Sequence, residues 1–180
     1  MAWTTPRTWV SNETLTAALL NTHLRDNLEE LDVAKVTAPG QYAVSTAANA
    51  LTARSYGWER INTSQNLVSP SGYSDLSTVG PTVTVTTGTR ALVLIAGQLD
   101  HGTDNGDSKI SYAISGATTQ AASDTWCIRR DGMAAGNSVR LSRHDLRVDL
   151  NAGSNTFTMK YFGSAGTQTY SNRVLAVFPL

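Results

Sequence analysis

The segment of this 180-residue chain that most suggests chemistry is the loop from Asp100 to Asp107. It places a histidine beside three carboxylates, those of Asp100, Asp104 and Asp107. A calcium loop supplies several oxygen ligands from one turn, but the spacing here does not match the D-x-[DN]-x-[DN]-G pattern. Asp, Asn and Gly are also the residues that ordinary turns between strands require. The loop therefore predicts a turn, and we expect no bound metal or cofactor.

The other candidate catalytic residues do not form a recognisable set. Ser142, His144 and Asp145 are close in sequence, but adjacent side chains on a strand point to opposite faces. The single cysteine, Cys127, has no partner for an intrachain disulfide, and within a strand it predicts a buried, inert thiol. A glycosidase needs paired carboxylates across a groove, whereas Glu59 is the last glutamate in the chain. The sequence therefore predicts a protein that is not an enzyme.

A cluster of arginines near the C-terminal third has two interpretations. One is that Arg140 and Arg147 pair with Asp145 and Asp149 across strands, which is common on sheet surfaces. The other is that the cluster binds an anionic glycan. The arginines are Arg129, Arg130, Arg140, Arg143 and Arg147.

The overall composition narrows the class of protein. Fourteen basic residues balance fourteen acidic ones, so the net charge gives no electrostatic footprint for nucleic acid. No apolar run approaches the roughly 18 residues that span a bilayer, and the first residues lack the apolar core of a signal peptide. We therefore expect a soluble protein made in a cytoplasm, without nucleic-acid or membrane partners. Charged residues are only 16% of the chain, below the usual ~25%, which favours strands and turns over surface helices.

From about Gly57 onward the pattern predicts β-strands. Apolar residues alternate with Thr, Ser and charged residues in short runs that end at Gly- or Asn-rich turns. The run from Ala91 to Leu99 is apolar except at Gly97 and Gln98, which predicts a central strand buried on both faces. The alternation slips at residues 143–145, which predicts a bulge or a tight turn. Eight or more short strands indicate a two-sheet sandwich or barrel, and the sequence order leaves jelly-roll and immunoglobulin-like arrangements open.

Ahead of the β region, residues 14–35 predict one α-helix, because they contain no Gly or Pro and are rich in Leu, Ala and Glu. Leu24, Leu28 and Leu31 follow the 4-then-3 spacing of a coiled-coil seam, which extends backwards through Asn21. The seam suggests a trimer contact. The alternative is an amphipathic helix that packs on its own domain.

The first residues predict an extended arm that carries Trp3, Pro6, Arg7 and Trp9. The two tryptophans either fold back on the helix of the same chain or anchor the arm in a groove on a partner, and we expect the partner. Pro39 and Gly40 end the helical region. We expect three parts: an arm and helix over residues 1–37, a linker over 38–56, and a β domain over 57–180.

Two regions resemble known families. Residues 3–10 (WTTPRTWV) and 16–28 (TAALLNTHLRDNL) resemble the N-termini of small virion proteins of tailed bacteriophages that infect actinobacteria, of the minor tail, tail-fibre or head-decoration type. Four later stretches resemble jelly rolls of the tumour-necrosis-factor and complement-globular-head type. They are residues 80–85, 90–93, 150–158 and 172–177.

This resemblance implies a homotrimeric virion protein whose arm docks on the phage capsid or tail and whose mainly β, jelly-roll domain is exposed. It leaves capsid and tail attachment open. The alternative function is a glycan-binding, host-recognising tail protein. Three seam leucines per chain contribute only a few kcal/mol at ~25 cal/mol per Å² of buried apolar area. We therefore expect one face of the jelly roll to supply most of the buried trimer surface.

Overall fold

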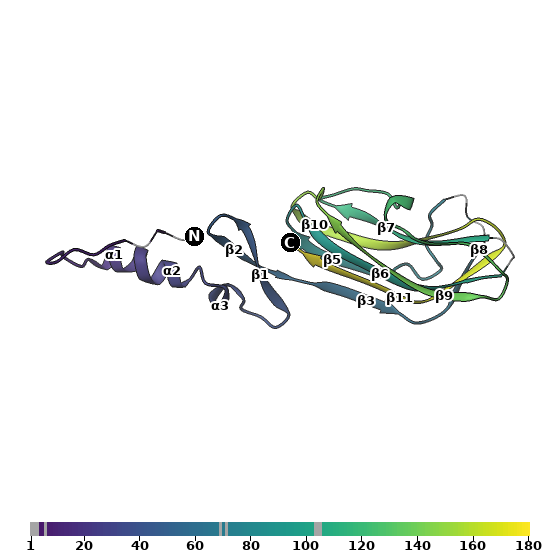
Figure 1. Ribbon diagram of the computed structural model, residues 1–180, viewed down its shortest axis with the longest axis horizontal. Coiled ribbons are helices and arrows are strands. Elements are labelled where there is room, and N and C mark those ends of the chain that lie inside the picture. Colours follow the sequence, from purple (N-terminus) through teal and green to yellow (C-terminus); the bar gives the residue numbers. More distant parts are fainter. Residues whose placement is uncertain (1–3, 6, 69, 71, 103–105) are drawn as a thin grey trace. The chain divides into compact units, whose positions relative to one another are not determined.

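The computed structural model describes residues 4, 5, 7–68, 70, 72–102 and 106–180. The chain divides into two compact units, Met1–Ser55 and Tyr56–Leu180. The N-terminal unit contains short helices and one β-hairpin, and the C-terminal unit is built from strands (Figure 1).

The helical part of the N-terminal unit is shorter than the sequence predicted, and it is interrupted. α1 (Ala17–Leu20), the π-helical turn η1 (Asn21–Arg25) and α2 (Asp26–Leu28) follow one another directly. The Thr16 hydroxyl oxygen begins the helix by accepting a hydrogen bond from the Leu19 N–H at 3.2 Å. The N–H groups of Glu30 and Leu31 bond back three residues instead of four, and α3 (Asp32–Lys35) is a separate turn. No Gly or Pro marks this break, so composition did not predict it.

The predicted linker over residues 38–56 is largely a β-hairpin, which corrects the expectation of irregular chain. β1 (Gln41–Ala47) pairs in antiparallel fashion with β2 (Ala50–Ser55). Asn49 adopts a φ of 56° in the turn, a conformation that asparagine tolerates better than most residues. The strands are rich in Ala, Ser and Thr, and their apolar alternation is therefore too weak to read from the sequence.

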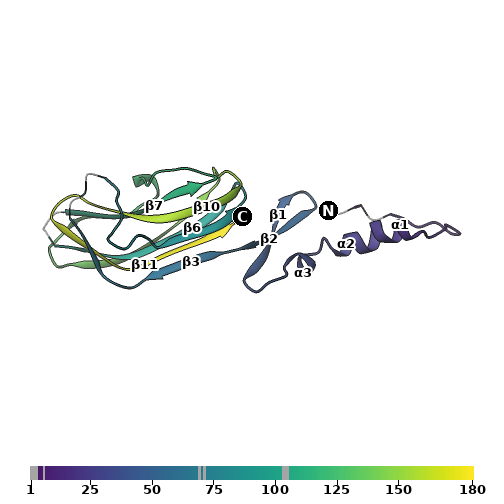
Figure 2. The same ribbon diagram turned by 180° about the vertical axis from the view of Figure 1, so that it is seen from behind.

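The C-terminal unit is an antiparallel jelly-roll β-sandwich, which confirms the mainly β fold class predicted from the sequence. One sheet has the order β5-β10-β7-β8 and the other β3-β11-β6-β9, with β4 also paired to β11. Most connections from β5 onward cross between sheets, as in a jelly roll rather than an immunoglobulin-like sandwich. Figure 2 shows β7 and β10 in one layer and β3, β6 and β11 in the other. The strands are β3 (Gly57–Ile61), β4 (Gln65–Val68), β5 (Thr82–Thr87), β6 (Ala91–His101), β7 (Gly106–Gly116), β8 (Ile128–Met133), β9 (Ser138–Arg147), β10 (Gly153–Gly163) and β11 (Thr167–Pro179), and η2 (Asp124–Trp126) is a 3₁₀ turn.

The core lies between the two sheets. Phe157 of β10 sits between Val83 of β5 and Ile114 of β7, and all three side chains are buried. Ile95 of β6 and Leu175 of β11 contribute to the same cluster from the other sheet. The alternating inward side chains of two facing sheets thus form one continuous core.

Two details of β6 and β9 differ from the sequence prediction. The run from Ala91 to Leu99 is buried on its inner face only, and Leu94 on the outer face is 39% exposed. β9 pairs with β6 in continuous register, so the predicted bulge at residues 143–145 is absent. The apolar pattern slips there because Val139 and Leu141 face inward while Leu146 faces outward.

Candidate association surfaces

The residues that suggested catalysis are not brought together. Along β9, Ser142 and His144 lie on the outer face of the sheet, and Asp145 lies on the opposite side of the strand. His101 is fully buried, its ring packs on the Cα of Gly106, and its Nε2 lies 3.2 Å from Nε2 of Gln168. Asp104 lies outside the described residues, and within the described ranges no three His, Cys, Asp or Glu side chains converge as metal ligands would. In the same part of the chain, no helix has the length and apolarity needed to span a membrane.

The N-terminal unit buries almost none of its apolar side chains. Among its described residues, Asn27 and Glu30 are buried, and no apolar side chain is. Lys35 Nζ lies 3.0 Å from Glu30 Oε1, and this hydrogen bond lowers the pKa of the Glu30 carboxyl. Isolated hairpins and helices of this length are marginally stable in water. Its exposed apolar side chains are therefore candidates for contacts outside the unit.

The arm lies back along the helix of its own chain. Asn27 Oδ1 accepts a hydrogen bond from the Thr4 N–H at 2.8 Å, and the Asn27 amide donates to the Thr4 carbonyl at 3.0 Å. Trp9 meets the ring of His23 edge-on at 6.1 Å. Arg7 stacks over Trp9 at 4.9 Å and forms an ion pair with Glu13. Trp3 and Pro6, the other two predicted anchor residues, lie outside the described residues.

Trp9 remains partly exposed despite these contacts. It lines an open pocket of about 380 Å³ together with Val10, Leu15, Leu20 and Leu24. The arm thus contacts its own helix, and one side of the Trp9 indole still faces an apolar hollow. Docking of Trp9 in a groove on a partner stays a prediction.

An exposed leucine stripe runs along the helix. Leu24 is 53% exposed and Leu28 is 62% exposed, although both are apolar. Leu20, which the predicted seam omitted, is exposed as well and lines the pocket that contains Leu24 and Trp9. Asn21 is exposed and lies outside that pocket. We call Leu20, Leu24, Leu28 and Leu31 the leucine stripe.

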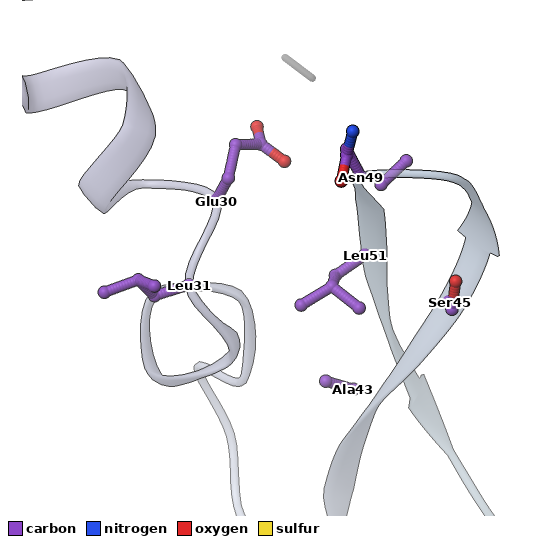
Figure 3. A pocket seen from close by; sticks show the side chains of 7 residues that line it. Glu30, Leu31, Ala43, Ser45, Asn49 and Leu51 are labelled. Atoms are coloured by element: carbon purple, nitrogen blue, oxygen red, sulfur yellow. The ribbon is translucent and has the colours of Figure 1, made fainter. Parts of the chain in front are cut away.

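The stripe continues into a second open groove, of about 530 Å³, between the turn after α2 and the hairpin. Figure 3 shows the Leu51 side chain of β2 in the gap between the hairpin and the turn that carries Glu30 and Leu31. Ala43, Ser45 and Asn49 complete the hairpin side. The groove is therefore apolar at its centre and has the buried Glu30 at its rim.

The jelly roll carries a second apolar surface on the outer face of the β3-β11-β6-β9 sheet. The register places Trp58 of β3 opposite Ala176 of β11, and Ala176 opposite Leu94 of β6. Leu92 lies beside Phe178 on one side and Leu146 on the other. Trp58 is 62% exposed, and Phe178 stacks on Tyr56 with centroids 5.5 Å apart. We call Tyr56, Trp58, Leu92, Leu94, Leu146, Ala176 and Phe178 the outer-sheet patch.

Exposed contiguous apolar patches are often found at interaction sites, so the outer-sheet patch is a candidate association surface. Sequence reasoning missed its individual residues. The available signal was the mostly apolar run from Ala91 to Leu99, which predicted burial on both faces. Within the sandwich only the inner face is covered.

The arginine cluster is largely neutralised by aspartates on the same chain. Arg129 pairs with Asp131 and with Asp107. Arg143 pairs with Asp145 at 2.7 Å, and Arg147 with Asp149 at 2.7 Å. The Arg129–Asp131, Arg143–Asp145 and Arg147–Asp149 pairs join residues two apart along the chain, whereas the Arg129–Asp107 pair joins β8 to β7. Three of the five arginines are thus paired within the chain, and binding of an anionic glycan stays a prediction.

No protein-family model matches this sequence, and no curated protein matches it significantly. Among solved structures, the Eiger tumour necrosis factor from S. frugiperda aligns at 9% identity and a TM-score of 0.49, covering 71% of this chain and 92% of that one. The infectious bursal disease virus VP2 subviral particle aligns at 9% identity and 0.47, covering 76% of this chain and 37% of that one. A carbohydrate-binding module of Cellvibrio mixtus lichenase 5A aligns at 15% identity and 0.31, covering 83% and 94%.

The chain spans little more than a third of the VP2 chain that it matches. With TM-scores below 0.5 and identities no higher than 15%, these likenesses identify neither a family nor an activity. The sheet orders themselves define the class: a jelly-roll protein with an N-terminal helix-and-hairpin unit.

Proposed function

We propose that this chain is a non-enzymatic structural protein of a tailed-bacteriophage virion. Three copies assemble through the outer-sheet patch and through the leucine stripes of their helices. Residues 1–55 attach the trimer to the capsid or tail, and the jelly roll is exposed on the virion surface.

The observation that carries this proposal is the distribution of apolar side chains in the N-terminal unit. A unit of this size that buries no described apolar side chain is completed by association. The leucine stripe and the pocket beside Trp9 provide the apolar surface for that association. The virion assignment is supported by the resemblance of residues 3–10 and 16–28 to phage virion proteins.

The second support comes from the jelly roll. Its outer-sheet patch groups seven apolar residues from four neighbouring strands and the residue before β3, away from the core between the sheets. Each copy presents the same patch, and a closed cyclic assembly covers it on every copy. A net charge of zero opposes such self-association only weakly.

Virions assembled with variant chains test the attachment. We expect an antibody against residues 56–180 to label intact virions, and we expect Trp9→Ala to reduce the amount of chain that co-purifies with virions. Val68→Ala, which truncates an exposed apolar side chain on the jelly roll, is the matched control and should leave incorporation unchanged. Normal incorporation of Trp9→Ala, or unlabelled virions, would contradict the proposal.

A further inference from the structure

The outer-sheet patch reaches both edges of its sheet, because β3 is the first strand in the sheet order and β9 is the last. One row of side chains shows this directly. Trp58 of β3 lies opposite Ala176, which lies opposite Leu94. Leu94 in turn lies opposite His144 of β9. Neighbouring strands are about 4.8 Å apart, so the Cα atoms of Trp58 and His144 are separated by about 14 Å, at the two ends of the row.

The most exposed apolar side chains of the patch lie at these two ends. Trp58 is 62% exposed and Tyr56 is 45% exposed at the β3 end, and Leu146 is 60% exposed at the β9 end. Between them, Leu94 is 39% exposed and Leu92 is half-buried. An adjacent molecule therefore covers more apolar area on each of these residues at the ends than on either of the two central leucines.

The charges on this face favour a second copy of the chain as that adjacent molecule. Across three rows of the sheet, the Arg60 guanidinium is the only group with a full charge at pH 7, and there is no carboxylate. Like charges that meet across an interface oppose association, and two copies of this face bring few of them together. The rows are Phe178–Leu92–Leu146, Trp58–Ala176–Leu94–His144 and Arg60–Val174–Ala96–Ser142.

The symmetry of the proposed trimer determines which parts of the patch can meet. A closed ring of three copies joins two different parts of each surface, whereas a two-fold dimer joins one part to itself. If residues 1–55 of all copies attach at one place, the three chains enter their jelly rolls at Tyr56 on the same side. The three-fold axis then runs close to the direction of β3. Each row of side chains consequently lies level with the same row of the next copy.

We propose that the β3 end of the patch on one copy packs against the β9 end of the patch on the next copy. Trp58 is the anchor of this contact, and it packs against His144 and Leu146. A large aromatic side chain at the centre of an interface supplies much of the binding energy. This contact rests on the proposed trimer and specifies how its copies meet.

Cross-linking tests the contact without removing a residue of the patch. Arg60 and Ser142 are exposed and lie at the two ends of the row next to that of Trp58. With a short bismaleimide, the Arg60→Cys and Ser142→Cys double variant should give covalent trimers on a denaturing gel. Each single variant should stay monomeric, and a mixture of the two single variants should give covalent dimers only. Cys127 is buried and present in every variant, so the single variants report any reaction of its thiol.

A double-mutant cycle tests the anchor. Trp58→Ala and Leu146→Ala should each weaken the trimer at least tenfold, as measured by light scattering at decreasing protein concentration. Combined in one chain, they should weaken it by less than the product of the single effects, because the two side chains contact each other between copies. Val68→Ala, which truncates another exposed apolar side chain of the same sheet, is the control and should leave the trimer unchanged.

The outcomes separate this contact from the proposed function. A trimer in solution whose double cysteine variant gives no covalent trimer would overturn the contact and leave the trimeric assembly standing. Covalent dimers from Arg60→Cys alone would show that β3 meets β3, and additive effects of Trp58→Ala and Leu146→Ala would show that the two residues do not touch. Either result overturns the contact. Covalent trimers of a chain that is absent from virions would support the contact and contradict the proposed function.

Discussion

Thr4 and Asn27 exchange two hydrogen bonds across 23 residues of chain: the Asn27 side-chain oxygen accepts from the Thr4 N–H, and its amide donates to the Thr4 carbonyl. A single asparagine side chain thus satisfies both backbone groups of an arm residue. Asn27 also donates to the His23 carbonyl at 3.3 Å within the helix. It is one of only two buried residues among those described in the N-terminal unit. The position of the arm therefore depends strongly on this residue.

Replacing Asn27 by Ala should release the arm. The Thr4 backbone groups lose their partners, at a cost of about 1–3 kcal/mol for groups of this kind. We expect trypsin to cleave after Arg7 several-fold faster in Asn27→Ala than in the unmodified chain. Asn21→Ala, which changes an exposed asparagine on the same helix, should leave the cleavage rate unchanged. Equal cleavage of all three proteins would show that Asn27 does not hold the arm.

The leucine stripe should control whether the helix is folded. Leu24→Asp combined with Leu28→Asp places charges on the surface that we propose is buried between copies, so the helical signal in circular dichroism should fall. Ala18 is exposed on the same helix and lies outside the leucine stripe, so Ala18→Asp should retain the helical signal in circular dichroism. If the double variant keeps its helicity, the helix does not depend on association.

The outer-sheet patch should control assembly of the jelly roll. Leu94 is central to the patch and faces away from the core, so Leu94→Asp should weaken association by about 2 kcal/mol or more per interface while the sandwich remains folded. Val68 lies on the same face of the sheet, toward the other end of β11, so Val68→Asp should have little effect on association. Light scattering at decreasing protein concentration compares the two variants. Equal dissociation of both would argue against the patch.

The buried tyrosines predict an alkaline transition. Burial raises the pKa of Tyr112 to about 12 and raises the pKa values of Tyr73, Tyr161 and Tyr170 further above the usual 10. The folded state favours the neutral phenols. Their contribution to stability is therefore complete below about pH 10 and is lost as the pH rises through the folded-state pKa values.

Ultraviolet absorbance of tyrosinate measures this transition. Fewer than half of the six tyrosines should ionise by about pH 11 while the protein stays folded, and the rest should ionise together as it unfolds. Gradual ionisation of all six with an intact fold would contradict the buried environments described above.

The sequence predicted the sandwich because alternation in strands such as Thr82–Thr87 follows directly from a half-buried sheet. It did not predict the hairpin of residues 41–55, because Ala, Ser and Thr carry little apolar signal. The spacing of Leu24, Leu28 and Leu31 predicted that these three residues form one apolar seam. Leu20 was missed because η1 contains a π-helical turn, which a regular heptad does not anticipate.

The order of strands within a sheet and the partners of ion pairs depend on residues that are distant in sequence. The residues of the association surfaces were therefore harder to predict. Trp58 and Leu94 lie 36 residues apart in sequence, and only their shared neighbour Ala176 places them on one face. Asp145 and Asp149 were predicted as partners of Arg140 and Arg147 across strands. In the structure Asp145 pairs with Arg143 and Asp149 with Arg147, because residues two apart share one side of an extended chain.

Light scattering after size exclusion, on the full-length protein and on residues 56–180, measures the proposed trimeric assembly. Residues 56–180 contain the whole core between the two sheets, so this fragment should fold by itself. We expect a trimer in both cases, with assembly in the jelly roll and residues 1–55 available for attachment. A monomeric full-length protein would contradict the trimeric account, and a trimer that becomes monomeric on truncation would move assembly to the leucine stripe.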